Sequence, residues 1–145
     1  MDRADQGFAY VDHTADLAVR AWGPTAGAAF AAAGWALTEA MVNLARVDGR
    51  VRREFAARAD SLELLLVDWL AALVAEKDTS GLVFSRFQVE TRTGADGASL
   101  RASAWGEPLD RERHEPRTEV KGISLLGLRV RRDGARWVVE YVADV

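Results

Sequence analysis

The sequence contains no cysteine and only two histidines in 145 residues. Without cysteine the chain has no disulfides, no thiolate metal ligands and no cysteine nucleophile, so any metal must be held by oxygen or imidazole groups. Glycine-rich phosphate loops, G-x-S-x-G elbows and H-x-x-x-H pairs are also missing. A general base with an oriented partner is hard to assemble from two histidines, and we therefore expect a protein that is not a self-sufficient enzyme.

Long apolar runs are missing as well. The most apolar stretches, around 26–37 and 62–74, are too short, or too interrupted by Glu63 and Asp68, to span a bilayer. No apolar segment follows the acidic first residues as it would in a signal peptide. We expect a cytoplasmic protein without a membrane partner. The net charge of −3 argues against a dedicated duplex-binding protein, because neutralising phosphates needs clustered Lys and Arg.

The length and the hydrophobic content of 49% suit one compact domain that spans residues 1–145. Helical periodicity dominates the first half of the chain, and period-two alternation dominates the second half. This order predicts an α+β fold in which two helices pack on a mainly antiparallel β-sheet.

The two helices are predicted from apolar periodicity and from capping residues. Thr25 is the expected N-cap of a helix from about Ala26 to Asn43, and Asp60 that of a second helix that runs to about Lys77. The second helix carries the strongest apolar stripe, made of Leu62, Leu65, Leu66, Trp69, Leu70 and Leu73. We expect this stripe to bury Leu66 and Trp69 against the sheet.

Alternating segments predict strands over residues 8–11, 17–22, 51–57, 82–92, 99–105, 119–132 and 136–143. The stretch from Gly94 to Gly97 and the pair Asp133-Gly134 supply the turn residues of two hairpins. The polar segment 106–117 is expected to be a solvated loop.

A polar cluster of Asp12, His13, Thr14 and Asp16 stands between the first two strands. Such residues satisfy local backbone donors at strand entries, or they form half of a site for a hard cation, which carboxylates suit. Asp144 and Val145 add a side-chain carboxylate and an α-carboxylate at the last two positions. A final strand beside the first strands would bring both groups together, which favours the cation site.

Glu119 and Lys121 stand two residues apart at the head of an expected strand, so both side chains leave the same face. They would form a polar site or an ion pair. The arginines near the last hairpin are interpreted as solubilising, with contact to a partner's RNA backbone as the alternative; they are Arg129, Arg131, Arg132 and Arg136.

Four stretches together resemble the archease family, small proteins that assist RtcB-type RNA-splicing ligases. They are DHTADLAVRAWG (12–23), LELLLVDWLAALVAEKDTSGLVF (62–84), GEPLDRERHEPRTEVKGISL (106–125) and WVVEYVADV (137–145). The resemblance implies a protein cofactor that promotes guanylylation and multiple turnover of the ligase in tRNA splicing and RNA repair. It also implies that the protein contacts RNA only indirectly, through the ligase.

The same resemblance implies a set of site residues. The metal ligands would be Asp16, Asp144 and Val145, holding a divalent cation, with calcium first and magnesium or manganese as alternatives. The residues implied in partner contact and activation are Asp12, His13, Glu119 and Lys121. The chain departs from the family pattern at Leu125 and Leu126, where relatives often carry tyrosine and histidine, and we assign no role to these two positions.

Two other functions stay open. A metal-dependent phosphohydrolase or nuclease would use the same carboxylates, and it predicts turnover by the isolated protein with magnesium or manganese. A chaperone-like modulator of RNA-modifying enzymes predicts binding to unrelated clients with no dependence on Asp16.

Overall fold

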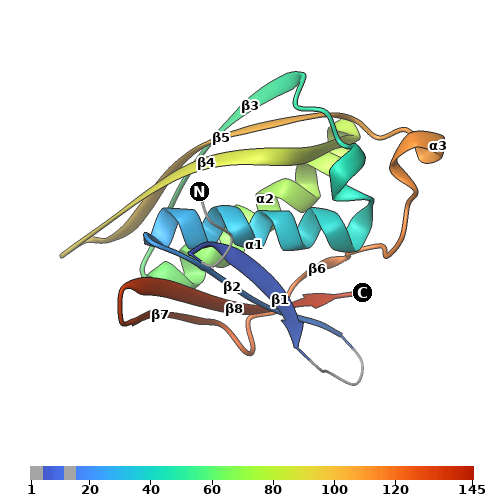
Figure 1. Ribbon diagram of the computed structural model, residues 1–145. Helices are drawn as coiled ribbons and strands as arrows, with labels where there is room; N and C mark the ends of the chain where they lie inside the picture. Colours follow the sequence, from blue (N-terminus) through green and yellow to red (C-terminus); the bar gives the residue numbers. More distant parts are fainter. Residues whose placement is uncertain (1–4, 12–15) are drawn as a thin grey trace.

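A computed structural model describes residues 5–11 and 16–145 of the chain. It contains two long helices, α1 (Ala26–Met41) and α2 (Leu62–Ser80), and two short ones, the 3-10 helix η1 (Leu44–Arg46) and α3 (Arg111–His114). The two long helices lie side by side between two β-sheets (Figure 1).

Every strand pair in both sheets is antiparallel. The larger sheet contains β1 (Gly7–Val11), β2 (Leu17–Gly23), β6 (Gly122–Ile123), β7 (Arg129–Asp133) and β8 (Arg136–Asp144), in the order β1-β2-β8-β6, with β7 also paired to β8. The smaller sheet contains β3 (Val51–Ala59), β4 (Leu82–Gly94) and β5 (Gly97–Pro108), in the order β3-β5-β4. The predicted α+β class with two main helices is confirmed, and the strands are divided between two sheets that enclose the helices.

Helix α1 is buried on most of its surface, which explains why it is built largely from alanine and glycine. The helix approaches the smaller sheet most closely at Gly27, where a Cβ atom would collide with the carbonyl oxygen of Val89. Small side chains therefore let both sheets come close to α1.

Helix α2 covers the other half of the core. Leu66 is fully buried, and Trp69 is 1% exposed, as the apolar stripe predicts. The indole Nε1 of Trp69 donates a hydrogen bond of 3.0 Å to the carbonyl oxygen of Phe30 on α1. The same ring packs edge-to-face on Phe55 and Phe87 of the smaller sheet, so one side chain connects both helices to this sheet.

The predicted N-cap is confirmed for α1 and wrong for α2. The hydroxyl of Thr25 accepts a hydrogen bond from the N–H of Ala28. In α2 the cap is Ser61 rather than Asp60, because the Ser61 hydroxyl accepts from the N–H of Leu64 at 3.2 Å.

Both predicted C-terminal ends are displaced. Helix α1 ends at Met41 instead of Asn43, since Val42 is already extended. Helix α2 continues past Lys77 to Ser80 and ends where Gly81 takes up left-handed backbone with φ of 70°. Among the described residues, no helix is long and apolar enough to cross a membrane.

Two predictions for the last third of the chain are wrong. The single strand expected over 119–132 is divided into β6 and β7 by a bend at 125–127, where Gly127 has φ of 75°. The two short strands pair with different parts of β8. The segment 106–117 is not a solvated loop either, because it begins inside β5 and contains α3.

The packing of α2 makes a stability prediction. Leu66→Ala should lower the free energy of unfolding by about 2 to 5 kcal/mol, because a fully buried side chain leaves a cavity that rigid neighbours fill only in part. Urea melts of the two proteins measure this difference. A loss below about 0.5 kcal/mol would contradict the assignment of Leu66 to the core.

Candidate functional site

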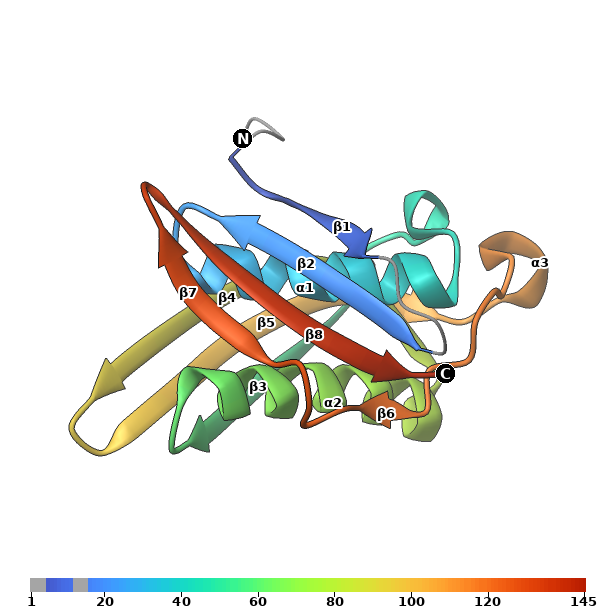
Figure 2. The ribbon, with the colours of Figure 1, turned by 90° about the horizontal axis from the view of Figure 1, so that it is seen from below.

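The pairing of β2 with β8 puts the start of β2 beside the end of β8 at one end of the larger sheet (Figure 2). Leu17 stands opposite Ala143 in this pairing. Asp16 directly precedes Leu17, and Asp144 directly follows Ala143, so both acidic residues leave the same end of the paired strands. The final strand thus lies beside the first strands, as the interpretation of the polar cluster required. We call this end, with residues 16, 121, 144 and 145, the carboxylate tip.

Lys121 reaches the carboxylate tip from the other edge of β8. Its backbone N–H donates a hydrogen bond of 2.8 Å to the carbonyl oxygen of Asp144. The side chains of Glu119 and Lys121 are exposed, whereas Val120 between them is 2% exposed. Both polar side chains therefore point away from the core. Their residues lie in irregular backbone before β6 and not in the predicted strand.

The donor set at the tip suits a hard cation. Asp16 is half-buried, Asp144 is exposed, and the carboxylate of Val145 follows directly. Asp12 and His13 lie outside the described residues. Within 5–11 and 16–145, no three side chains of His, Asp or Glu form a group that could hold a metal. The site therefore offers two described side-chain carboxylates, which are oxygen ligands of the kind that calcium and magnesium prefer.

Exposed apolar side chains occur on the segments that lead to and from the carboxylate tip along the chain. Leu125 and Leu126 are 69% and 80% exposed in the bend after β6, and the N–H of the preceding Ser124 bonds to the carbonyl oxygen of Val142 in β8. The rest of this group, which we call the apolar rim, consists of Tyr10, Val11 and Val145. The two leucines departed from the expected family pattern, and the sequence alone assigned them no role.

A buried hydrogen-bonded pair, Glu107 and His114, fixes the segment that leads to Lys121. Glu107 is 2% exposed, and His114 of α3 is fully buried. The Nδ1 atom of His114 accepts a hydrogen bond of 2.8 Å from the N–H of Asp110. Its Nε2 atom therefore carries the proton and donates to the carboxylate of Glu107 at 3.0 Å, so the imidazole is neutral.

Three further groups hold the carboxylate of Glu107. The N–H of Asp48 donates at 2.6 Å and the guanidinium of Arg50 at 2.8 Å, and the guanidinium of Arg113 lies 3.6 Å away. Burial alone would raise the pKa of Glu107, but these hydrogen bonds and the nearby positive charge outweigh burial and lower the pKa to about 2. The carboxylate is thus ionised and ties η1, α3 and β5 together.

The same segment completes the C-terminal end of α1. The N–H groups of Arg117 and Thr118 donate to the carbonyl oxygens of Met41 and Ala40 at 2.8 and 3.0 Å. These carbonyls have no partner within the helix, so the hydrogen bonds satisfy them. The backbone that carries Glu119 and Lys121 is therefore fixed to the core before it reaches the tip.

A family model with the description "Archease protein family (MTH1598/TM1083)" matches residues 8–145 of the chain. The chain belongs to the archease family. Protein archease of Pyrococcus abyssi is 37% identical over 138 residues, which cover 94% of this chain and 96% of the relative. Protein archease of Thermococcus gammatolerans is 38% identical over 138 residues with the same coverage.

Solved structures have the same fold as this archease. The solution structure of Methanobacterium thermoautotrophicum protein 1598 has a TM-score of 0.82 and 29% identity, and the match covers 96% of this chain and 99% of that one. The crystal structure of an archease from Thermotoga maritima, described as a possible chaperone, has a TM-score of 0.61 and 18% identity, with coverage of 93% and 94%. The second likeness concerns the fold alone.

The lowered pKa of Glu107 makes the stability of this archease sensitive to acid. The unfolded chain, in which Glu107 has its ordinary pKa near 4.5, takes up the proton before the folded chain does. The stability from the ionised carboxylate is complete above about pH 5 and is lost as the pH falls toward about 2. Urea melts between these pH values should show the decline.

Glu107→Gln should be less stable than the natural chain at neutral pH, by about 1 to 3 kcal/mol, and its stability should decline less in acid. Glu90→Gln, at an exposed position of β4, is the matched control and should keep the acid dependence of the natural chain. Parallel pH curves for Glu107→Gln and the natural chain would contradict the role of this carboxylate.

Proposed function

We propose that this archease is a metal-binding protein cofactor that activates an RtcB-type RNA-splicing ligase and is not itself the catalyst. In this proposal the ligase partner becomes guanylylated more readily and turns over repeatedly. The cation is divalent, with calcium first, and its ligands are Asp16, Asp144 and Val145. The partner contacts are assigned to Asp12, His13, Glu119 and Lys121.

The observation that supports this proposal best is the pairing of β2 with β8, which puts Asp16 and Asp144 at the same end of the larger sheet. The bend that follows β6 adds exposed apolar side chains that a site serving only the stability of the chain would not need. Leu125 and Leu126, at 69% and 80% exposed, are instead the kind of side chains that a protein partner covers. Carboxylates at the tip and exposed leucines in the bend after β6 together have the composition of a docking surface.

The acidic and basic residues of the tip have different roles in this proposal. When bound, a divalent cation supplies positive charge where nucleotide phosphates and carboxylates of the ligase centre are arranged. Asp16 and Asp144 hold that charge at the end of a sheet whose strands are fixed by hydrogen bonds. Lys121 adds an ammonium group, and the bond from its N–H to Asp144 sets its backbone beside the carboxylates.

Activation follows if the archease binds one state of the ligase more tightly than the others. A partner shifts a conformational equilibrium only by its difference in affinity for the two states. In the proposal the favoured state is the one competent for guanylylation. Hydrogen bonds fix the backbone between Glu107 and Lys121 to the rest of the protein. Little conformational freedom of this segment is therefore lost when the tip contacts the ligase.

Asp16→Ala should leave the fold intact and lower the stimulation of ligase turnover by about tenfold or more, because the site loses one of its hard ligands. Multiple-turnover ligation of a labelled RNA, with and without the archease, measures the effect. Asp68→Ala, at an exposed position of α2, removes the same charge far from the tip in sequence and should stimulate like the natural chain. Normal stimulation by Asp16→Ala at saturating calcium would contradict the proposal.

The same assay separates the alternatives. Hydrolysis of RNA or nucleotide by the isolated protein with magnesium or manganese, lost in Asp16→Ala, would favour a phosphohydrolase or nuclease. Lys121→Ala should lower stimulation and leave calcium affinity unchanged, since its assigned role is contact with the partner. Lower calcium affinity in Lys121→Ala would contradict this division of roles.

A short Gly-Ser extension after Val145 tests the terminal carboxylate. The extension replaces a charged ligand with a neutral amide carbonyl and crowds the tip, so calcium affinity and ligase guanylylation should both fall. Thermal stability should change little, because Val145 is 40% exposed. An equal extension before Met1 is the control. Equal calcium affinity and equal activation in the two extended chains would show that Val145 is only the end of a strand.

A further inference from the structure

The outer face of the smaller sheet is a second charged surface. Its inner face packs on the helices, and its outer face is uncovered along most of its length (Figure 1). Alternate residues of the three strands point outward, and five of them are arginines. We call this surface the arginine face, and its arginines are Arg52, Arg58, Arg86, Arg92 and Arg101.

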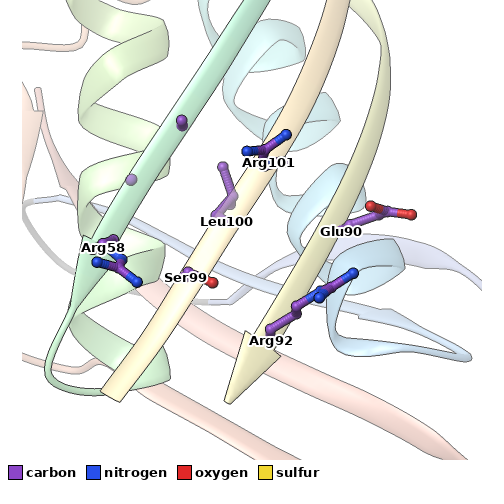
Figure 3. A pocket seen from close by; sticks show the side chains of 8 residues that line it. Arg58, Glu90, Arg92, Ser99, Leu100 and Arg101 are labelled. Carbon is purple, nitrogen blue, oxygen red and sulfur yellow. The ribbon is translucent and has the colours of Figure 1, made fainter. Parts of the chain in front are cut away.

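The strand register arranges these arginines in rows across the sheet. Arg58 and Arg92 stand on either side of Ser99 in one row. Arg101 occupies the centre of the next row, between Ala56 and Glu90. Successive rows are two residues apart along the strands, or about 7 Å. Figure 3 shows Arg58, Arg92 and Arg101 around a shallow hollow of about 800 Å³.

Trp105 stands between two further arginines in the fourth row, opposite Arg52 on β3 and Arg86 on β4, and the row of Ser103 separates it from Arg101. The guanidinium carbon of Arg86 lies 4.2 Å from the ring centre, and that of Arg52 lies 5.4 Å away. The aromatic ring thus holds both guanidinium groups on the sheet surface by cation–π attraction.

The arginine face opposes the charge of the whole chain. Its five arginines and two glutamates, Glu54 and Glu90, give a charge of +3, whereas the chain carries −3. Arg52 forms an ion pair with Glu54 at 2.7 Å. The other four arginines of the face make no ion pair with any residue in 5–11 or 16–145. Four exposed arginines thus form no ion pair in the described part of the chain, and Glu90, opposite Arg101, is the acidic residue of their rows.

We propose that the arginine face binds single-stranded nucleic acid through its phosphate backbone. The planar fork of arginine matches a phosphate with two parallel hydrogen bonds. Proteins that bind single strands combine a positive surface that follows the backbone with aromatic and guanidinium planes against which bases stack. Arg86 over Trp105 offers such a plane, and the rows of arginine offer the positive track.

Two other anionic partners fit the face less well. A membrane surface or an acidic protein would call for large apolar side chains among the charges. The large apolar side chains that are exposed in the described residues lie elsewhere, at Leu64 of α2 and in the apolar rim. The arginine face also ends at the β4–β5 turn, on the far side of the molecule from the C-terminus (Figure 1). The proposal therefore concerns a surface separate from the carboxylate tip and does not rest on the proposed function.

The test measures fluorescence anisotropy of a labelled oligouridine of about 12 nucleotides with the full chain and no ligase. The key variant is Arg58→Gln/Arg92→Gln/Arg101→Gln. The matched control, Arg129→Gln/Arg131→Gln/Arg132→Gln, removes the same charge from exposed residues of β7. Circular dichroism verifies that both variants are folded. Glu90→Gln removes a negative charge from the face. This variant should bind the oligouridine more tightly than the natural chain does.

The key variant should bind the oligouridine at least about tenfold more weakly than the control does. The slope of its log affinity against log salt concentration should also be smaller in magnitude by up to about 2. An oligodeoxythymidine should bind with similar affinity, since phosphates carry the contact. Three results would overturn the proposal: no binding by the natural chain at low salt, equal loss in the two triple variants, or equal affinity for polyglutamate or anionic vesicles.

Discussion

The antiparallel pairing of β2 with β8 is the interaction on which the rest of the structure depends. It runs from Leu17 opposite Ala143 to Gly23 opposite Trp137 and joins the two ends of the chain. It closes the larger sheet over α1, where the hydroxyl of Tyr141 donates to the carbonyl oxygen of Ala33 at 3.0 Å. The same pairing makes the carboxylate tip. A site assembled from both chain ends can exist only in the folded protein, so binding a cation there would also stabilise the fold.

The two sheets divide the surface of this archease into regions with different chemistry. Because the long helices pack their apolar faces between the sheets, each sheet keeps an outer face and free ends for contacts with other molecules. The larger sheet ends in carboxylates and exposed apolar side chains, and the smaller sheet presents arginines. The two proposals assign the ligase contact to one end of the molecule and the nucleic acid contact to another face. Figure 1 shows that the β4–β5 turn and the C-terminus lie at opposite ends of the molecule.

Features with a local signal could be predicted from the sequence, and features that depend on distant partners could not. The stripe around Trp69 predicted a helix with one buried face, and Asp133-Gly134 predicted a hairpin, because each signal lies within a few neighbouring residues. Burial of His114 was not predictable, since it requires Glu107 of β5 and the N–H of Asp110 to satisfy its ring. The rows of the arginine face needed the register of three strands. The roles assigned to the carboxylate tip came from family resemblance and remain predictions.

Manganese titration observed by NMR tests most directly whether a divalent cation binds where β2 and β8 meet, as proposed. The paramagnetic ion broadens the amide signals nearest to it, independently of any ligase. The account predicts that the signals of Asp16, Lys121, Asp144 and Val145 disappear first at substoichiometric manganese, and that added calcium restores them. Broadening that begins at other acidic residues, or uniform broadening that calcium does not reverse, would contradict the account.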